Sequence, residues 1–327
     1  MTNHLAQQII AGDRRALARG ITLVESTRVD HRQQATELLQ QIMPATGKAI
    51  RLGISGAPGV GKSTFIEALG NALTQRQQRV AVLAVDPTSA VSGGSILGDK
   101  TRMETLAVNP DAFVRPTPAG KTLGGVARYT REAILLCEAA GFDSILVETV
   151  GVGQSETLVA AMTDMFVLLL SPGGGDDLQG IKRGIMELTD LILVNKADGD
   201  QLAVAEQTVT DYRAAQQFMQ PRNQHWKPQV LSCSALEKRG LDKIIALIDE
   251  FHQALEAAGE LAAVRSRQAR DWLWSETTAS LIADLKDHPS IKTMISELEQ
   301  AVADETLPPT VAAQQLIAHY KGIALHK

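Results

Sequence analysis

Apolar residues in the first forty positions recur mostly three and four residues apart among polar ones. Leu5, Ile9, Leu17 and Ile21 illustrate this spacing, which is typical of amphipathic helices. Residues 44–48 contain a proline and a glycine, and they break the pattern. We therefore predict a helical N-terminal extension over residues 1–48.

Short apolar runs follow, and longer amphipathic stretches separate them. The runs cover residues 49–55, 79–85, 144–147, 165–170, 191–194 and 229–232. Near-continuous apolar sequence is typical of strands that are buried on both faces of a parallel sheet. Parallel strands need crossover connections, which the amphipathic stretches can supply as helices. Over residues 49–255 we predict an α/β fold, a three-layer sandwich with a mostly parallel sheet.

Beyond about residue 251 the strand-like runs stop. The sequence becomes rich in Ala, Glu, Gln and Leu, and His288-Pro289 and Pro308-Pro309 interrupt it. Helix-forming sequence between proline breakers predicts successive helices. We therefore predict a C-terminal helical arm over residues 256–327.

Composition narrows the classes of partner. The 327 residues carry a net charge of -5 with a pI near 5.8, so no global basic field would attract nucleic acid or anionic lipid. Cys137 and Cys233 are far apart and lack the spacing of metal ligands, which favours a reduced, cytoplasmic setting. No segment approaches the roughly 20 apolar residues of a membrane span. We expect neither a nucleic acid nor a membrane as partner.

A phosphate-binding motif lies where the first predicted strand meets the first predicted crossover helix. The pattern G-x-x-x-x-G-K-[ST] is matched by Gly56, Ala57, Pro58, Gly59, Val60, Gly61, Lys62 and Ser63, with Thr64 following in the helix. Glycines let backbone N–H groups turn toward phosphate oxygens, and the helix N-terminus adds partial positive charge. We expect Lys62 to reach the β- and γ-phosphates and Ser63 to reach Mg²⁺. A chance match is the alternative, but the strand, loop and helix context favours a P-loop NTPase.

A second motif predicts which base is bound. Asn195-Lys-Ala-Asp198 follows the apolar run 191–194, at the strand end where ligands bind in open α/β sheets. Asp198 can accept from the N1–H and the amine of guanine, whereas adenine would leave the carboxylate unpaired, a mismatch that costs roughly 10⁴-fold. Asn195 would brace the loop, and the stem of Lys196 would pack along the base. Backbone donors to guanine O6 are expected near Ser234, Ala235 and Leu236. A surface turn is the alternative for this motif.

Carboxylates end two of the predicted strands beside the phosphate loop. Asp86 follows the run 79–85, and Glu148 follows the run 144–147. Mg²⁺ is usually held by one or two carboxylates together with phosphate oxygens, so both residues suit a metal site. Gly151 is expected to offer its N–H to the γ-phosphate, and Asp99 lies in a glycine-containing stretch that could order around the nucleotide. For Asp86, Glu148 and Asp99 the alternative is an ordinary turn or loop acid.

With these residues in hand, the chain resembles the MeaB/ArgK family of P-loop GTPases along nearly its whole length. The segments that carry the resemblance are Val85-Asp-Pro-Thr-Ser89, Gly93-Gly-Ser-Ile-Leu-Gly-Asp-Lys-Thr-Arg-Met103, Val147-Glu-Thr-Val-Gly-Val-Gly-Gln-Ser-Glu156 and Gly173-Gly-Gly-Asp-Asp-Leu-Gln-Gly-Ile-Lys182. Members of this family protect and load adenosylcobalamin-dependent methylmalonyl-CoA mutase. The resemblance therefore implies GTP and GDP with Mg²⁺ as ligands, this mutase as partner, and a homodimer joined through the C-terminal arm.

The resemblance also assigns roles to single residues. It implies a metal site formed by Ser63, Asp86, Asp99 and Glu148. It implies catalytic roles for Lys62, Asp99, Glu148 and Lys182. Residues 86–102 and 148–156 become nucleotide-responsive switches, and the loop 173–184 resembles a third switch that relays nucleotide state to the mutase. A flexible connector is the alternative for that loop.

Other functions stay open at this point. One is a binding module in which hydrolysis plays no part. Another is an ATP- or GTP-dependent kinase linked to basic amino-acid transport, as some relatives were described. A third is a nickel-inserting metallochaperone GTPase, although the seven histidines are scattered. We expect slow hydrolysis without a partner, because neither an arginine finger nor a water-orienting residue can be assigned, even though Gln154 and Lys182 lie near the expected γ-phosphate.

Overall fold

The computed structural model describes residues 2–85, 103–117, 123–149, 155–173 and 183–322. It divides the chain into two compact units, residues 1–268 and 269–327, which are described separately. The sequence predicted three parts, with boundaries at residues 48/49 and 255/256, and this division stays a prediction.

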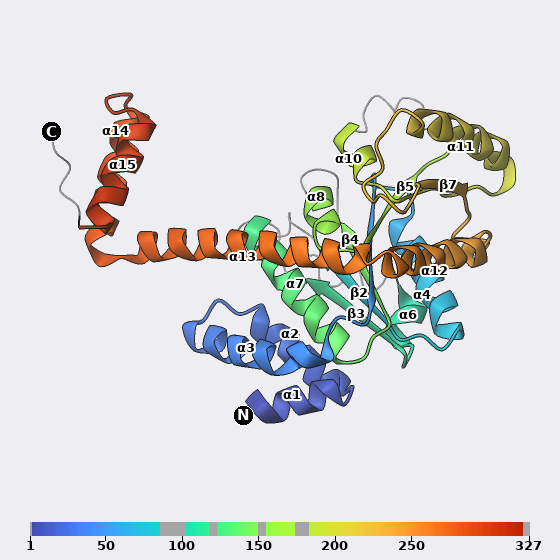
Figure 1. The fold of residues 1–327 in the computed structure, drawn as a ribbon, viewed down its shortest axis with the longest axis horizontal. Coiled ribbons are helices and arrows are strands. Elements are labelled where there is room, and N and C mark those ends of the chain that lie inside the picture. Colours follow the sequence, from blue (N-terminus) through green and yellow to red (C-terminus); the bar gives the residue numbers. More distant parts are fainter. Residues whose placement is uncertain (1, 86–102, 118–122, 150–154, 174–182, 323–327) are drawn as a thin grey trace. The chain divides into compact units, whose positions relative to one another are not determined.

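The first unit is built on a parallel seven-stranded sheet (Figure 1). Its strands are β1 (Ile50–Gly56), β2 (Val80–Val85), β3 (Ala112–Thr117), β4 (Ser144–Thr149), β5 (Met165–Leu170), β6 (Leu191–Val194) and β7 (Gln229–Ser232). Their order is β3-β2-β4-β1-β5-β6-β7, so β1 lies between β4 and β5. The carboxyl ends of β1, β4 and β6 therefore share one edge of the sheet.

Helices precede, connect and follow the strands. They are α1 (Thr2–Ile10), α2 (Arg14–Val24), α3 (Val29–Ile42), α4 (Lys62–Gln75), α6 (Glu104–Val108), α7 (Leu123–Ala139), α8 (Ser155–Ala160), α10 (Arg183–Glu187), α11 (Leu202–Gln216), α12 (Leu241–Ala257) and α13 (Glu260–Asp287), with 3-10 turns at Met43–Ala45 and Gly199–Gln201. Helices α4, α6 and α12 pack on one face of the sheet and α7 and α8 on the other, which confirms the predicted sandwich (Figure 1).

Alternation of side chains along the strands explains these layers. In β5, Phe166 belongs to the core under α7 and α8, whereas Met165 and Val167 belong to the core under α4 and α12. Helices cover both faces of the sheet, so the side chains that point to either face are apolar, as the near-continuous runs predicted. The predicted runs coincide with β5, β6 and β7, and match β1, β2 and β4 to within two residues.

Strand β3 was missed by the sequence pattern. It lies at one edge of the sheet, and among the described strands it pairs only with β2. Its sequence contains Arg115 and Pro116, which interrupt an apolar run. A proline is tolerated at a sheet edge because its missing N–H removes no bond from an inner ladder.

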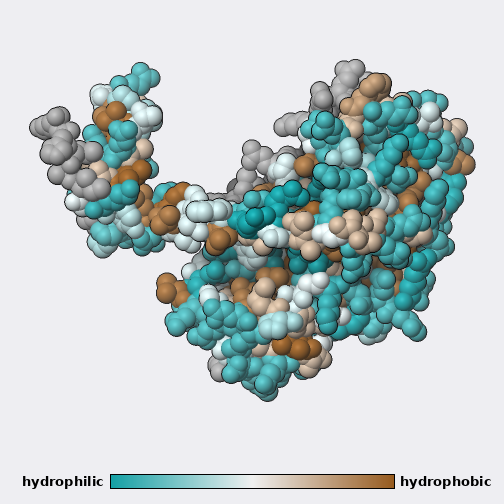
Figure 2. Space-filling model, in the orientation of Figure 1, coloured by the Kyte–Doolittle hydropathy of each residue, from teal (hydrophilic) through white to brown (hydrophobic). Residues whose placement is uncertain are grey.

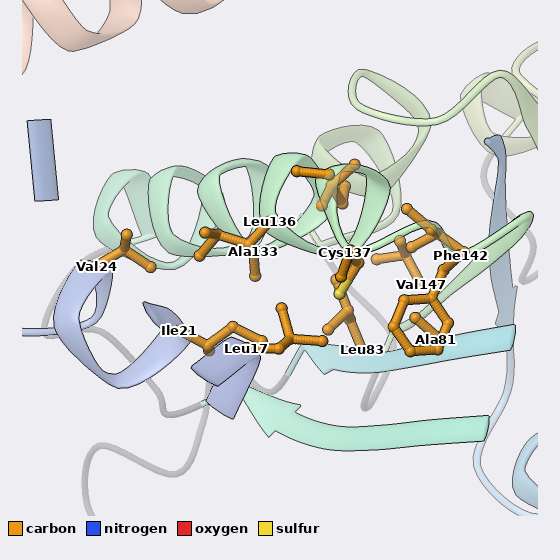
Figure 3. Packing of buried hydrophobic residues seen from close by; sticks show 14 of the residues in the cluster. Leu17, Ile21, Val24, Ala81, Leu83, Ala133, Leu136, Cys137, Phe142 and Val147 are labelled. Atoms are coloured by element: carbon orange, nitrogen blue, oxygen red, sulfur yellow. The ribbon is translucent and has the colours of Figure 1, made fainter. Parts of the chain in front are cut away.

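The helical N-terminal extension packs directly on the sandwich. Leu17, Ile21 and Val24 of α2 are fully buried and share a cluster with α7 and β2 (Figure 3). Gly20 lets α2 pack closely against α1, because a Cβ at this position would come within 2.8 Å of Ile9 Cδ1. The predicted amphipathic pattern thus corresponds to α1, α2 and α3, whose apolar faces complete the core of the first unit.

The second unit contains the end of α13, then α14 (Pro289–Ala303) and α15 (Pro309–Tyr320). Both prolines occupy the first helical position, where a missing N–H costs no hydrogen bond. Helices α14 and α15 pack together, and Tyr320 contacts the His288 ring and donates to Asp284. This confirms the helical C-terminal extension. Among the described residues, no helix is long and apolar enough to cross a membrane.

Candidate nucleotide site

The phosphate-binding segment joins β1 to α4, as its sequence predicted. Helix α4 begins at Lys62, and Gly61 before it adopts a left-handed conformation with φ of 91°. A Cβ on Gly61 would come within 2.8 Å of the Asn195 side-chain nitrogen. Glycine is required here both by the backbone angle and by the approach of the base-recognition segment.

Lys62 folds back into the loop that precedes it. Its Nζ donates to the carbonyl oxygens of Gly56 at 2.7 Å and Ala57 at 3.2 Å. Burial lowers the pKa of Lys62, while the charges of Glu148 and Glu156 act in the opposite direction. The ammonium group therefore lies inside the loop where phosphate oxygens are expected.

The neighbouring Ser63 contacts the carboxylate at the end of β4. Its hydroxyl donates to Glu148 Oε1 at 3.3 Å, and Glu148 is buried. Behind this contact, the Thr149 hydroxyl donates to the Ser55 hydroxyl at 2.9 Å, which ties the ends of β1 and β4 together. A hydroxyl and a carboxylate side by side form an oxygen donor set that fits Mg²⁺.

The segment 195–198, which is predicted to read the base, is tied to the phosphate loop by two side chains. Asn195 Nδ2 donates to Val60 O at 2.9 Å, and Lys196 Nζ donates to Gly59 O at 2.6 Å. Asn195 Oδ1 accepts the backbone N–H of Ala235 at 3.1 Å. One asparagine thus connects the loops that follow β1, β6 and β7, the bracing role expected of it.

Asp198 is oriented by a hydroxyl that the sequence analysis did not use. Ser234 is fully buried, donates to Asp198 Oδ2, and accepts the Glu237 N–H at 3.0 Å. The sequence predicted only a backbone role for this serine. Leu236 is 78% exposed, beside the buried Ala235. Ser234 lies six positions before Gly240, the N-cap of α12, and nothing in this local sequence indicates its contact with Asp198. The contact depends on the pairing of β6 with β7.

Cys233 lies behind the same segment. Its thiol is 3.8 Å from Asn195 Oδ1, and burial raises its pKa to about 12. The thiol therefore stays protonated and acts as a small packing group.

The remaining predicted site residues make no contact at the site that the structure describes. Thr64 is exposed on the first turn of α4. Asp86, Asp99, Gly151 and Lys182 lie outside the described residues, as do Gln154 and most of the three predicted switches. Across the part of the chain that the structure describes, no group of three or more His, Cys, Asp or Glu side chains is arranged to hold a metal ion.

A phosphate loop at the end of β1, joined through Asn195 and Lys196 to an N-K-x-D segment at the end of β6, defines the class of P-loop GTPases. Residues 17–290 match the protein family described as methylmalonyl Co-A mutase-associated GTPase MeaB. This chain belongs to the MeaB family, and it is a GTPase.

Known proteins resemble the chain over almost its full length. It is 48% identical to the GTPase ArgK of Escherichia coli, over 93% of this chain and 92% of that protein. It is 46% identical to the mitochondrial methylmalonic aciduria type A homolog of Mus musculus, over 96% of this chain and 78% of that protein. A crystal structure described as LAO/AO transport system kinase superposes with a TM-score of 0.77 at 39% identity, covering 98% of this chain and 97% of that one.

Proposed function

We propose that this GTPase is a nucleotide-switched chaperone for adenosylcobalamin-dependent methylmalonyl-CoA mutase. The observation that carries the proposal is the match of residues 17–290 to a family described by its association with that mutase. The 46% identity to a mouse protein whose description names methylmalonic aciduria supports this partner, because methylmalonic acid and the mutase's substrate share the methylmalonyl group.

The nucleotide roles follow from the contacts at the site. We infer that Asp198 accepts from guanine, with Ser234 holding its other oxygen, and that Lys196 lies along the base. Lys62 would exchange its carbonyl partners for the β- and γ-phosphates. Backbone groups of Ser234, Ala235 and Leu236 would approach guanine O6. These contacts grip both ends of the nucleotide, because Asn195 links the two halves of the site.

Mg²⁺ fits the oxygen donors Ser63 and Glu148, with Asp86 and Asp99 as the other ligands that we propose. When bound, it would neutralise charge between the β- and γ-phosphate oxygens. The chain's own contribution to hydrolysis is positioning and charge stabilisation, in which Lys62, Glu148 and Lys182 take part. We propose slow turnover without the mutase, since the sequence assigns neither an arginine finger nor a water-orienting residue.

The decisive experiment combines nucleotide affinity with turnover. We expect the mutase to change the affinity for a non-hydrolysable GTP analogue relative to GDP, because coupling between two binding sites is reciprocal. We also expect it to raise the rate of GTP hydrolysis. Calorimetry and a phosphate-release assay, with and without the mutase, measure both. No change in either quantity would reject this partner.

A Lys62→Ala variant separates a switch from a passive binding module. We expect it to lose protection of the mutase from inactivation, since the phosphate contacts are lost. Equal protection by the variant and the wild type would show that nucleotide plays no part. Transfer of labelled γ-phosphate to any acceptor but water would instead favour the kinase role named for the solved relative.

We further propose a homodimer joined through the C-terminal arm, and a cytoplasmic location. Along the second unit, the exposed large apolar residues of α13 include Leu273 at 62%, Trp274 at 70% and Leu281 at 57%. Figure 2 shows brown, hydrophobic surface on this part of the chain. Exposed apolar side chains of this size favour association. The location is inferred from the two free thiols, Cys137 and Cys233.

A further inference from the structure

The turn between α8 and β5 accepts hydrogen bonds from side chains of α13 and of the loop after α11. It includes Thr163 and Asp164, both of them buried. Asp164 Oδ2 accepts the backbone N–H of Arg51 at 2.9 Å, which fixes the turn to β1. The turn lies at the amino end of the sheet, opposite the nucleotide site, and the proposed nucleotide contacts do not use it.

Arg265 of α13 contacts this turn with its guanidinium fork. Nε donates to Asp164 Oδ1 at 2.8 Å and Nη2 to Asp164 Oδ2 at 2.6 Å. The same side chain donates to Gly47 O at 2.7 Å and to Ala49 O at 2.6 Å, just before β1. Three residues further along α13, Gln268 Nε2 donates to Thr163 O at 2.9 Å. A lysine cannot reproduce the two parallel bonds of this pair.

A second arginine holds the turn from another side. Arg222 Nη2 donates to the carbonyl oxygens of Ala160 at 2.8 Å and Thr163 at 3.2 Å. Its other nitrogen, Nη1, donates to buried Asp190 at 3.2 Å. The end of α8 is thus fixed to the loop after α11 as well as to α13.

Helix α8 packs on β1 without an intervening side chain. A Cβ on Gly53 would come within 2.7 Å of Thr163 Oγ1 and 2.8 Å of Val159 Cγ1. Gly53 lies three residues before Gly56, where the phosphate loop begins. Helix α8 begins six residues after Thr149, so it follows β4 in the chain. Near its end, β4 carries Glu148, which accepts a hydrogen bond from Ser63. A displacement of α8 must disturb either its packing on β1 or the contacts of Thr163 and Asp164 with α13.

We propose that Arg265 is a positioning residue that couples the nucleotide state of the site to α13 through the α8–β5 turn. The proposal rests on the proposed nucleotide switch and adds the route by which the switch reaches the helix that continues into the C-terminal arm. Interiors are close-packed, so a shift at one end of α8 is carried to its other end. Arg265 and Gln268 contact that other end.

Hydrogen exchange of the full-length protein tests this route. With GDP and with a non-hydrolysable GTP analogue, we expect exchange rates of amides 261–268 to differ at least about 5-fold in the wild type. In Arg265→Lys and Arg265→Met we expect this difference to disappear while peptides over 155–162 still respond. We also expect the ratio of GDP to analogue affinity to change about 5-fold. Arg267→Met, an exposed arginine on the same helix, is the matched control and should behave as the wild type.

The outcomes separate this proposal from the proposed function. Equal exchange over 261–268 in both nucleotide states, with a response near 155–162, would overturn the role of Arg265 alone. Equal exchange along the whole chain would overturn the nucleotide switch itself. A purely structural role predicts that the variants lower the unfolding free energy equally with either nucleotide and leave the affinity ratio unchanged. If Arg265→Met does not fold, the wild type and Arg265→Lys still decide the question.

Discussion

Asp198 shares its two carboxylate oxygens between the protein and the base that we propose it recognises. Ser234 donates to Oδ2, and the carboxylate is only partly buried. Guanine would therefore meet a carboxylate whose orientation is already fixed, which reduces the entropy lost on binding.

Replacing Asp198 with asparagine tests base recognition. The amide can accept from an N1–H but presents N–H groups to the exocyclic amine of guanine, so we expect GTP affinity to fall about 100-fold or more. Xanthine carries a carbonyl at that position, so xanthosine triphosphate should become the better ligand. Competition calorimetry measures both, and Asp200→Asn, two residues away and exposed, is the control. Unchanged GTP affinity would contradict the assignment of Asp198.

Asp190 is a buried carboxylate just before β6, at the opposite end of that strand from the proposed nucleotide site. It accepts from Phe166 N at 2.8 Å, Asn223 Nδ2 at 2.7 Å and Arg222 at 3.2 Å. Burial raises its pKa to about 6, and Arg222 opposes the shift. The folded chain therefore binds this proton more tightly than the unfolded chain does.

The sign of the pH effect follows from this raised pKa. Between the ordinary aspartate value near 3.8 and about 6, the folded state carries more proton, so this group's contribution to stability rises as pH falls. We expect the unfolding free energy of the wild type, relative to Asp190→Asn, to increase from pH 7 to pH 5. Urea unfolding at both pH values measures it. A constant difference would mean that Arg222 keeps Asp190 ionised throughout.

At the scale of elements, the N-terminal helices are part of the core of the first unit. Leu17 is fully buried between α2 and its neighbours, whereas Val29 at the start of α3 is 86% exposed. We expect Leu17→Ala to lower the unfolding free energy by about 2–5 kcal/mol, and Val29→Ala by less than about 0.5 kcal/mol. Denaturant unfolding of both variants makes the comparison. Equal effects would mean that α2 can separate from the sandwich without unfolding it.

Elements were predictable where local pattern and burial agree. The apolar runs of β5, β6 and β7 were located to the residue, because strands covered on both faces leave a continuous signal. Edge strand β3 was missed because Arg115 and Pro116 give no such signal. The phosphate-loop and N-K-x-D motifs are each contiguous in the sequence, so they could also be found from local pattern. The Ser234 hydroxyl and the Arg265 fork were not predictable, since their partners lie 36 and 101 positions away.

At the scale of the whole molecule, the proposed dimer depends on the apolar residues of α13. Trp274→Glu and Leu281→Glu place a charge where we expect a partner subunit, so both should yield a monomer. Sedimentation velocity at several protein concentrations measures the state. Phe218→Glu, at an 86% exposed position in the first unit, is the control and should leave it unchanged. A monomeric wild type would remove this part of the proposal.

The two buried cysteines can report local opening of the folded protein, because each thiol reacts only when it becomes exposed. Cys137 belongs to α7 and points into the core, Cys233 lies beside Asn195, and burial raises the pKa of both thiols. Thiolates are the reactive form, so alkylation must await local opening. In excess reagent, the labelling rate of each thiol measures how often its surroundings open. We expect GTP to slow alkylation of Cys233 more than that of Cys137, which mass spectrometry of the labelled peptides can follow without any engineered probe.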